Sequence, residues 1–143
     1  MNQAESKQKV LPLAVPQDPD LALVLLLLRR MASGDLHRDE IAALGYQAFG
    51  RDYERPLTLI RAYLIETCTG ATRRISMVGK DHGRMTYDEG RLIDTLVLAL
   101  RDGEGARAHL RELTGREDVD APLAAARLLA GALIEMGCPL GRA

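Results

Sequence analysis

The sequence predicts an all-α protein, folded as a single-domain bundle of about six helices. Three observations support this fold class. The chain of 143 residues is 47% hydrophobic but only 3% aromatic, so its core must be built from aliphatic side chains, which suit helices better than sheets. Apolar residues recur at three- and four-residue spacing along the candidate helices. Aspartate, proline, threonine and glycine stand where helices are expected to begin and end.

The chain is expected to begin with a flexible N-terminal arm. Residues 1–17 are polar and then punctuated by Pro12 and Pro16, without helical periodicity, and such a composition favours an irregular segment. We expect residues 10–15 of this arm to lie extended on the body of the helical domain. That domain is assigned to residues 18–143.

The first helix is predicted to begin at Asp18, which suits the N-cap and is followed by proline at the first helical position. It ends near Ser33, with Arg29 close to the negative end of the helix dipole. Every residue from Leu21 to Leu28 is apolar. A helix that is hydrophobic on nearly every face is either central to the fold or shared with a second subunit, and both interpretations stay open.

The next two helices are expected over residues 37–49 and from about residues 52–56 to residue 69. Asp35 is the predicted cap of the earlier helix, while Gly50 and Gly70 follow the two helix ends. The later helix carries an apolar stripe at helical spacing. The stripe consists of Leu57, Ile60, Leu64 and Cys68.

The fourth helix has the clearest start in the chain. Thr86 is followed three residues later by Glu89, which is the spacing of a capping box, where each side chain bonds the other residue's backbone amide. This helix is predicted to continue until Gly103. A shorter fifth helix follows over about residues 104–113, and a sixth over about residues 120–137.

Composition and charge argue against several classes of protein. A formal net charge of -1 and a pI near 6.3 lack the basic excess of a nucleic-acid-binding protein. The apolar run from Leu21 to Leu28 is shorter than the roughly 20 residues of a membrane span and lacks the flanks of a signal peptide. Cys68 and Cys138 lack metal-ligand spacing and are interpreted as small buried hydrophobes. We therefore expect a cytoplasmic protein with no metal, no cofactor and no membrane span.

An irregular, charged loop at about residues 71–85 separates the third helix from the fourth, and two interpretations of it stay open. In one, the basic side chains and the backbone amides at the next helix start bind a phosphate or carboxylate. In the other, which we favour, the loop is a solvated connector whose arginines pair with nearby acids. The candidate anion-binding residues are Arg73, Arg74, Lys80, His82, Arg84 and Thr86. No catalytic residue is predicted.

Several short fragments follow one another in a familiar order. They are Arg29-Arg30-Met31, Phe49-Gly50, Arg55-Pro56-Leu57 with Arg61-Ala62, and Arg84-Met85-Thr86 with Asp88-Glu89. Through these fragments, over about residues 20–100, the chain resembles a family of small alphaproteobacterial proteins known only as a domain of unknown function. The resemblance implies a bacterial cytosolic protein and supplies no activity.

The predicted architecture favours a non-enzymatic interaction or regulatory module that forms a homodimer. The first and last helices are apolar on more than one side, but a six-helix bundle has room at its centre for about one such helix. Self-association through residues 20–33 or 121–137 would bury the apolar surface of the helix that is not central. Two alternatives remain. One is a small anion- or ligand-binding protein, or an enzyme, that uses the loop at 73–86, and the weaker one is a nucleic-acid-binding regulator.

Overall fold

The computed structural model describes residues 11–34, 38–79, 82–138 and 140. Within these ranges six α-helices and a two-stranded β-ladder form an all-α fold, which confirms the predicted fold class. A 3₁₀ turn, η1 (Gly50–Asp52), joins the second of these helices to the third. The helices are α2 (Pro19–Ala32), α3 (Arg38–Phe49), α4 (Glu54–Thr69), α5 (Tyr87–Leu98), α6 (Gly103–Thr114) and α7 (Asp120–Glu135).

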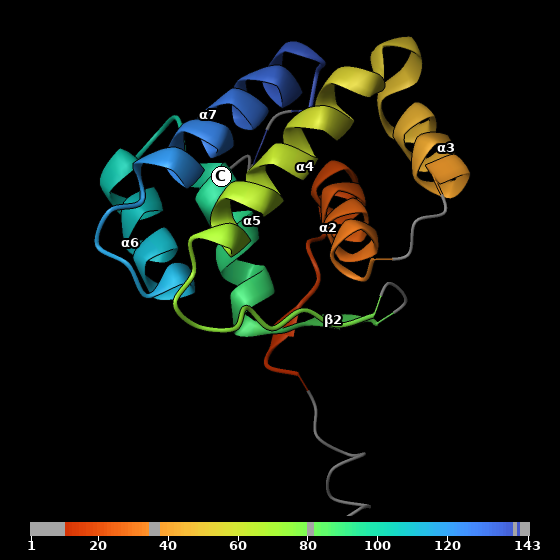
Figure 1. The fold of residues 1–143 in the computed structure, drawn as a ribbon. Helices are drawn as coiled ribbons and strands as arrows, with labels where there is room; N and C mark the ends of the chain where they lie inside the picture. Colours follow the sequence, from red (N-terminus) through yellow and green to blue (C-terminus); the bar gives the residue numbers. More distant parts are fainter. Residues whose placement is uncertain (1–10, 35–37, 80–81, 139, 141–143) are drawn as a thin grey trace, which may run out of the picture.

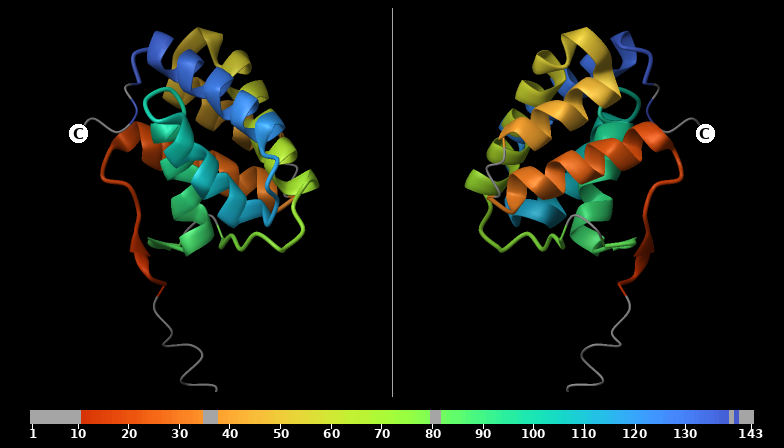
Figure 2. Two further views of the ribbon diagram at one scale, coloured as in Figure 1. Left: turned by 90° about the vertical axis from the view of Figure 1, so that its left-hand side faces the viewer. Right: turned by 90° about the vertical axis from the view of Figure 1, so that its right-hand side faces the viewer.

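The helices pack as pairs around α4 (Figure 1). α4 and α7 run antiparallel, because Arg55 at the start of α4 bonds Glu135 at the end of α7. α5 and α6 form a second pair, while α2 contacts α3, α4 and α5. Figure 2 shows α6 on one side of the molecule and α2 with α3 on the opposite side. No helix in the described part of the chain is long and apolar enough to cross a membrane.

The core is aliphatic, as the scarcity of aromatic residues predicts, and one tyrosine joins it. Tyr63 of α4 is fully buried, and its hydroxyl donates to the carbonyl of Leu92 on α5 at 2.8 Å. Burial raises the pKa of Tyr63, because desolvation disfavours the phenolate. The largest fully buried aliphatic side chains are Leu27, Leu28, Ile60, Leu92, Leu96, Leu110, Leu113, Leu123, Leu129 and Leu133.

α2 packs its apolar face into the core. Asp18 caps it as predicted, since its carboxylate accepts from the backbone amide of Asp20 at 2.9 Å. Its apolar face is covered by the chain itself, with Val24, Leu27 and Leu28 no more than 1% exposed. The apolar run of the first helix is therefore used for the core of the monomer. Asp35, the predicted cap of the next helix, lies outside the described residues.

The predicted end of the fourth helix is wrong. α5 ends at Leu98, and Gly103 is the first residue of α6 rather than the terminator of α5. The Asp102 carboxylate accepts from the backbone amide of Gly105 at 3.1 Å and thereby caps α6. Glycine is a common signal for a helix end and aspartate for a helix start, and at this boundary the aspartate sets the structure.

The described part of the N-terminal arm pairs with the loop before α5. β1 (Leu13–Ala14) and β2 (Arg84–Met85) are antiparallel, with Leu13 opposite Met85. The Leu13 side chain also lies against α5, where a Cβ added to Gly90 would stand 2.3 Å from Leu13 Cδ1. Residues 13–14 thus lie extended on the helical body, while residues 1–10 are outside the described part of the chain.

Candidate functional site

A buried ion pair joins the end of α2 to the start of α5. Arg29 and Glu89 are 3% and 0% exposed. The guanidinium donates to both carboxylate oxygens, from Nε at 2.8 Å and from Nη2 at 3.0 Å. It also donates to the carbonyls of His82 and Arg84, each at 2.7 Å. Such a bidentate pair with further hydrogen bonds satisfies a charge that burial would otherwise disfavour.

The predicted capping box is present and is part of the same cluster. Thr86 Oγ1 accepts from the amide of Glu89 at 2.9 Å, and a Glu89 oxygen accepts from the amide of Thr86 at 3.0 Å. Glu89 also accepts from the amide of Val78 at 3.1 Å, while the Thr86 hydroxyl donates to the Ser76 carbonyl at 2.7 Å. The Glu89 carboxylate therefore occupies the helix N-terminus, which is the place where the sequence predicts an anion.

A second ion pair holds the loop beside this cluster. Arg73 forms a bidentate pair with Asp88, at 3.2 and 3.1 Å, and also donates to the carbonyl of Leu113 on α6 at 2.8 Å. Asp88 accepts in addition from the amide of Ser76 at 2.7 Å. The loop is thus fixed to α5 on both sides of Arg74.

The predicted anion-binding residues bond to different parts of the chain. Arg73 is directed to Asp88 and α6, and Thr86 caps α5. Arg84 donates to the carbonyls of Leu11 at 2.7 Å and Pro12 at 3.2 Å, so that it holds the arm beside the loop.

The other predicted residues differ in their surroundings. His82 is exposed, and its ring Nδ1 accepts from the amide of Arg84 at 3.1 Å. Arg74 is exposed and lines a groove. Lys80 lies outside the described residues. The anion site at the start of α5 remains a prediction.

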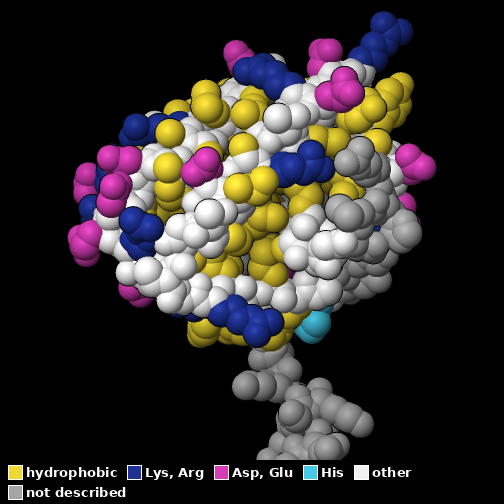
Figure 3. All heavy atoms as spheres, in the orientation of Figure 1, with side chains coloured by type: hydrophobic (Ala, Val, Ile, Leu, Met, Phe, Trp, Pro, Cys, Tyr) yellow, Lys and Arg dark blue, Asp and Glu magenta, His cyan; other side chains and the backbone are white. Residues whose placement is uncertain are grey.

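The groove beside Arg74 has a volume of about 630 Å³ and lies between the end of α2, the second half of α4 and residues 74–77. Figure 3 shows a hollow below α4 with hydrophobic side chains on its walls. Its lining residues are Ala32, Leu64, Ile65, Cys68, Thr69, Arg74, Ile75, Ser76 and Met77. We refer to these residues as the Arg74 groove.

The cysteine prediction is correct for Cys138, which is buried, and wrong for Cys68, which is exposed in the Arg74 groove. A groove separates Cys68 from residues 74–77 of the loop, so the last position of the apolar stripe is only partly covered. Partial burial raises the pKa of the Cys68 thiol, so the thiol stays protonated at neutral pH.

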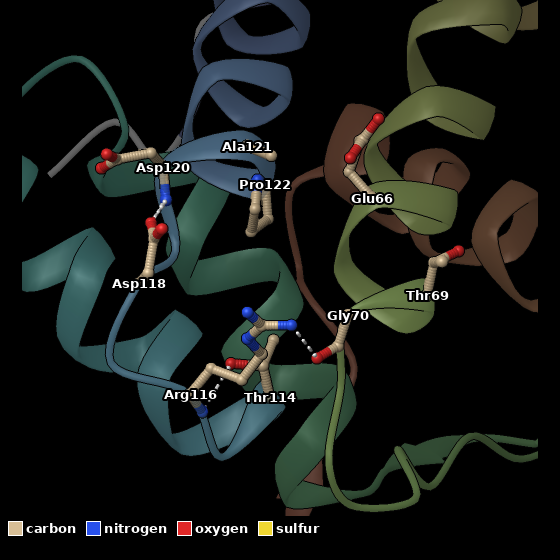
Figure 4. Close-up of a pocket in the computed structure, with 9 residues that line it drawn as sticks. All are labelled: Glu66, Thr69, Gly70, Thr114, Arg116, Asp118, Asp120, Ala121 and Pro122. Atoms are coloured by element: carbon tan, nitrogen blue, oxygen red, sulfur yellow. Dashed lines mark hydrogen bonds between the residues drawn. The ribbon is translucent and has the colours of Figure 1, made fainter.

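A smaller cleft of about 400 Å³ lies between the end of α4 and the start of α7 (Figure 4). Arg116 reaches across it and donates to the Gly70 carbonyl at 3.3 Å. The carboxylates around it point apart: Asp118 accepts from the amide of Asp120 at 3.1 Å, and Asp120 pairs with Arg107. No group of three or more potential metal ligands converges within the described residues. The cleft is thus bridged by the chain's own bonds.

An apolar surface patch lies where α7 passes the end of α5. Leu100 and Ile134, 53% and 50% exposed, line one shallow depression of about 170 Å³. The rest of its lining consists of Leu96, Val97, Arg101, Ala130 and Leu140. We refer to these residues as the α5–α7 patch.

Comparison with known proteins places the chain in a family. A model described as "Family of unknown function (DUF6628)" matches residues 2–137. The chain belongs to this family. No curated protein and no solved structure matches it. The predicted resemblance to a domain of unknown function is thereby confirmed, and any function must be argued from the geometry of the DUF6628 fold.

The sequence of this DUF6628 chain does not reveal the burial of Arg29, which is the one basic side chain among the buried residues that the structure describes. Its position near the end of the first helix predicts an interaction with the helix dipole, whereas the structure pairs Arg29 with Glu89. The pair of acids at the start of α5 was visible as a capping signal. Its long-range partners were not, because they lie in α2 and in the loop after α4.

Proposed function

We propose that the protein is a non-catalytic interaction module that binds a second copy of itself through the α5–α7 patch. The observation that carries this proposal is that Leu100 and Ile134, both about half exposed, share one depression. An isologous contact would cover the same patch on both copies. Burial of apolar surface favours such a contact by about 25 cal/mol per Å² removed from water.

The distribution of apolar surface favours the last helix over the first as the interface. The apolar residues of α2 pack inside the monomer, with Val24, Leu27 and Leu28 almost inaccessible. α7 also packs on α4 and α5, but it keeps Ile134 and Leu128 at the surface. Of the two helices predicted to self-associate, α7 is therefore the one with large apolar side chains exposed at the surface.

The polar cluster at the start of α5 supports a structural role for the loop. Arg29, Glu89, Arg73 and Asp88 bond to one another in pairs and to backbone groups of the loop. These bonds hold residues 73–86 against α5 and α2. A cluster that is used in this way stabilises the fold, which agrees with a binding module rather than with a reaction centre.

The proposal places the protein in the cytosol of a bacterium. Its support is the sequence resemblance together with the two cysteines, which are both free thiols in the structure. Unpaired cysteines are typical of a reducing compartment.

Sedimentation velocity at high micromolar concentration tests self-association. We expect the wild type to sediment as a dimer and the double variant Leu100→Asp/Ile134→Asp as a monomer, because two buried carboxylates on each copy would be desolvated without partners. The matched control is Leu128→Asp, an exposed leucine of α7 (63% exposed) outside the patch, which should remain dimeric. Circular dichroism of each variant establishes that it is folded.

Two results would contradict the proposed function. One is a wild type that sediments as a monomer at the highest concentration. The other is a double variant that stays dimeric, whether or not the Leu128→Asp control dissociates.

A further inference from the structure

We propose that the Arg74 groove binds a small amphipathic carboxylate, with its charged end at Arg74 and its hydrocarbon part against Leu64 and Ile75. The groove lies at the end of α4, apart from the α5–α7 patch, and this inference does not depend on self-association. It rests on the charge of the groove, on its apolar walls and on the way in which its loop side is held.

The charge of the groove favours an anion. Arg74 is its single charged lining residue, and no aspartate or glutamate lines it. Arg74 makes no ion pair or hydrogen bond with the residues that the structure describes, whereas the adjacent Arg73 is fully engaged with Asp88 and α6. A guanidinium presents several donors in a plane and matches the two oxygens of a carboxylate.

Four other clefts on the described surface differ in this respect. Three of them combine arginine with acidic residues: Arg116 with Glu66, Asp118 and Asp120, then Arg61 with Glu54, and finally Arg51 and Arg55 with Asp52, Glu54 and Glu135. In the fourth, the Arg101 side chain donates to the carbonyl of Leu140. Among these five clefts, the Arg74 groove is therefore the one that combines a lining without carboxylates and an arginine that bonds to no residue in the described part of the chain.

The walls favour an anion that carries a hydrocarbon part. Leu64 is 7% exposed and Ile65 is 52% exposed, while Ile75 and Met77 are partly buried against the core. A bare ion such as phosphate would leave these side chains in water, whereas a hydrocarbon chain would cover them. Cys68 adds no opposing charge, because its thiol is protonated at neutral pH.

The loop side of the groove is held in place before any ligand binds. The amide of Ser76 donates to Asp88 and the amide of Val78 donates to Glu89. Together with the Arg73–Asp88 pair, these bonds fix the backbone on both sides of Arg74. A wall that is already ordered does not lose conformational entropy on binding, so less of the contact energy is offset.

Isothermal titration calorimetry with three probes tests the chemistry of the ligand. Octanoate, used below its micelle-forming concentration, carries both parts, octan-1-ol carries only the chain, and acetate carries only the charge. We expect saturable binding of octanoate. The affinities for octan-1-ol and for acetate should each be at least about tenfold weaker than the affinity for octanoate, because a charge-assisted hydrogen bond and an apolar chain each contribute at least a factor of ten. Equal affinity for octanoate and either single-feature probe would overturn the inference.

Two variants and the alkylation rate of one cysteine test whether octanoate binds in the Arg74 groove. Arg74→Gln is expected to reduce octanoate affinity to that of octan-1-ol, while Arg61→Gln, an equal change of charge at an exposed position of α4 outside the groove, should bind as wild type. Octanoate should also slow alkylation of Cys68 by iodoacetamide at mildly alkaline pH, measured by peptide mass spectrometry with the buried Cys138 as reference.

Several results would overturn this proposal. They are no saturable octanoate binding, equal binding by the Arg74→Gln and Arg61→Gln variants, or unchanged alkylation of Cys68 in the presence of saturating octanoate. The monomeric variant Leu100→Asp/Ile134→Asp is expected to bind octanoate like the wild type. Failure of self-association and failure of the groove as a binding site are therefore separate outcomes.

Discussion

Replacement of Glu89 by glutamine is expected to lower the free energy of unfolding by about 3–5 kcal/mol. The change removes the negative charge but leaves the Arg29 guanidinium in place, 3% exposed, so that a buried cation loses its counter-charge. A urea titration followed by far-UV circular dichroism measures the loss. The same substitution weakens the bonds to the amides of Thr86 and Val78, which adds to the effect.

The matched control breaks an ion pair at the surface. Glu135→Gln removes the partner of Arg55, and these side chains are 65% and 61% exposed. Solvent-exposed pairs contribute little, so the expected loss is below about 1 kcal/mol. The double variant Arg29→Met/Glu89→Gln should be less destabilised than the sum of its two single variants, because it leaves no unpaired charge. Equal losses for Glu89→Gln and Glu135→Gln would show that the buried pair does not stabilise the fold.

Leu28→Ala is expected to lower the free energy of unfolding by about 2–5 kcal/mol. Leu28 is 0% exposed in the centre of the core, so truncation leaves a cavity that the surrounding helices fill only in part. The comparison is Leu128→Ala, the same chemical change at a side chain that is 63% exposed, with an expected change within about 0.5 kcal/mol. Both values follow from urea titrations of the two variants.

The Leu28→Ala variant also separates the two predicted roles of the first helix. Because α2 is covered by its own chain, the folded variant should sediment like the wild type. A variant that keeps wild-type stability but loses self-association would instead identify α2 as the interface between copies.

Local signals in the sequence were sufficient for most helix boundaries. Asp18 and the Thr86–Glu89 box act within one helical turn, so the residues that make the bonds are also neighbours in the printed sequence. The error at Gly103 is of the same local kind, because glycine and aspartate compete there as signals for an end and a start. The β1–β2 ladder was not predicted, since its strands are only two residues long and far apart in the chain.

The candidate site was predicted only in part, because its contacts are long-range. Arg74 was among the predicted anion-binding residues, but the groove that it lines is assembled from three separate segments of the chain. The charge of Arg73 and Arg84 makes them candidates for anion binding, but in the structure Arg73 pairs with Asp88 and Arg84 bonds to the N-terminal arm. Which arginine is engaged and which faces a groove depends on how the loop lies on α5, and spacing in the sequence does not contain that information.

The contact between Leu13 and Gly90 constrains how the family can vary. A Cβ at position 90 would stand 2.3 Å from the tip of Leu13, so a side chain there forces Leu13 to turn aside and weakens the hold of the arm on α5. We therefore expect the two positions to covary among related chains, with glycine at 90 where position 13 is long and apolar, and a larger residue at 90 only where position 13 is small. An alignment of family members in which the two positions vary independently would contradict this expectation.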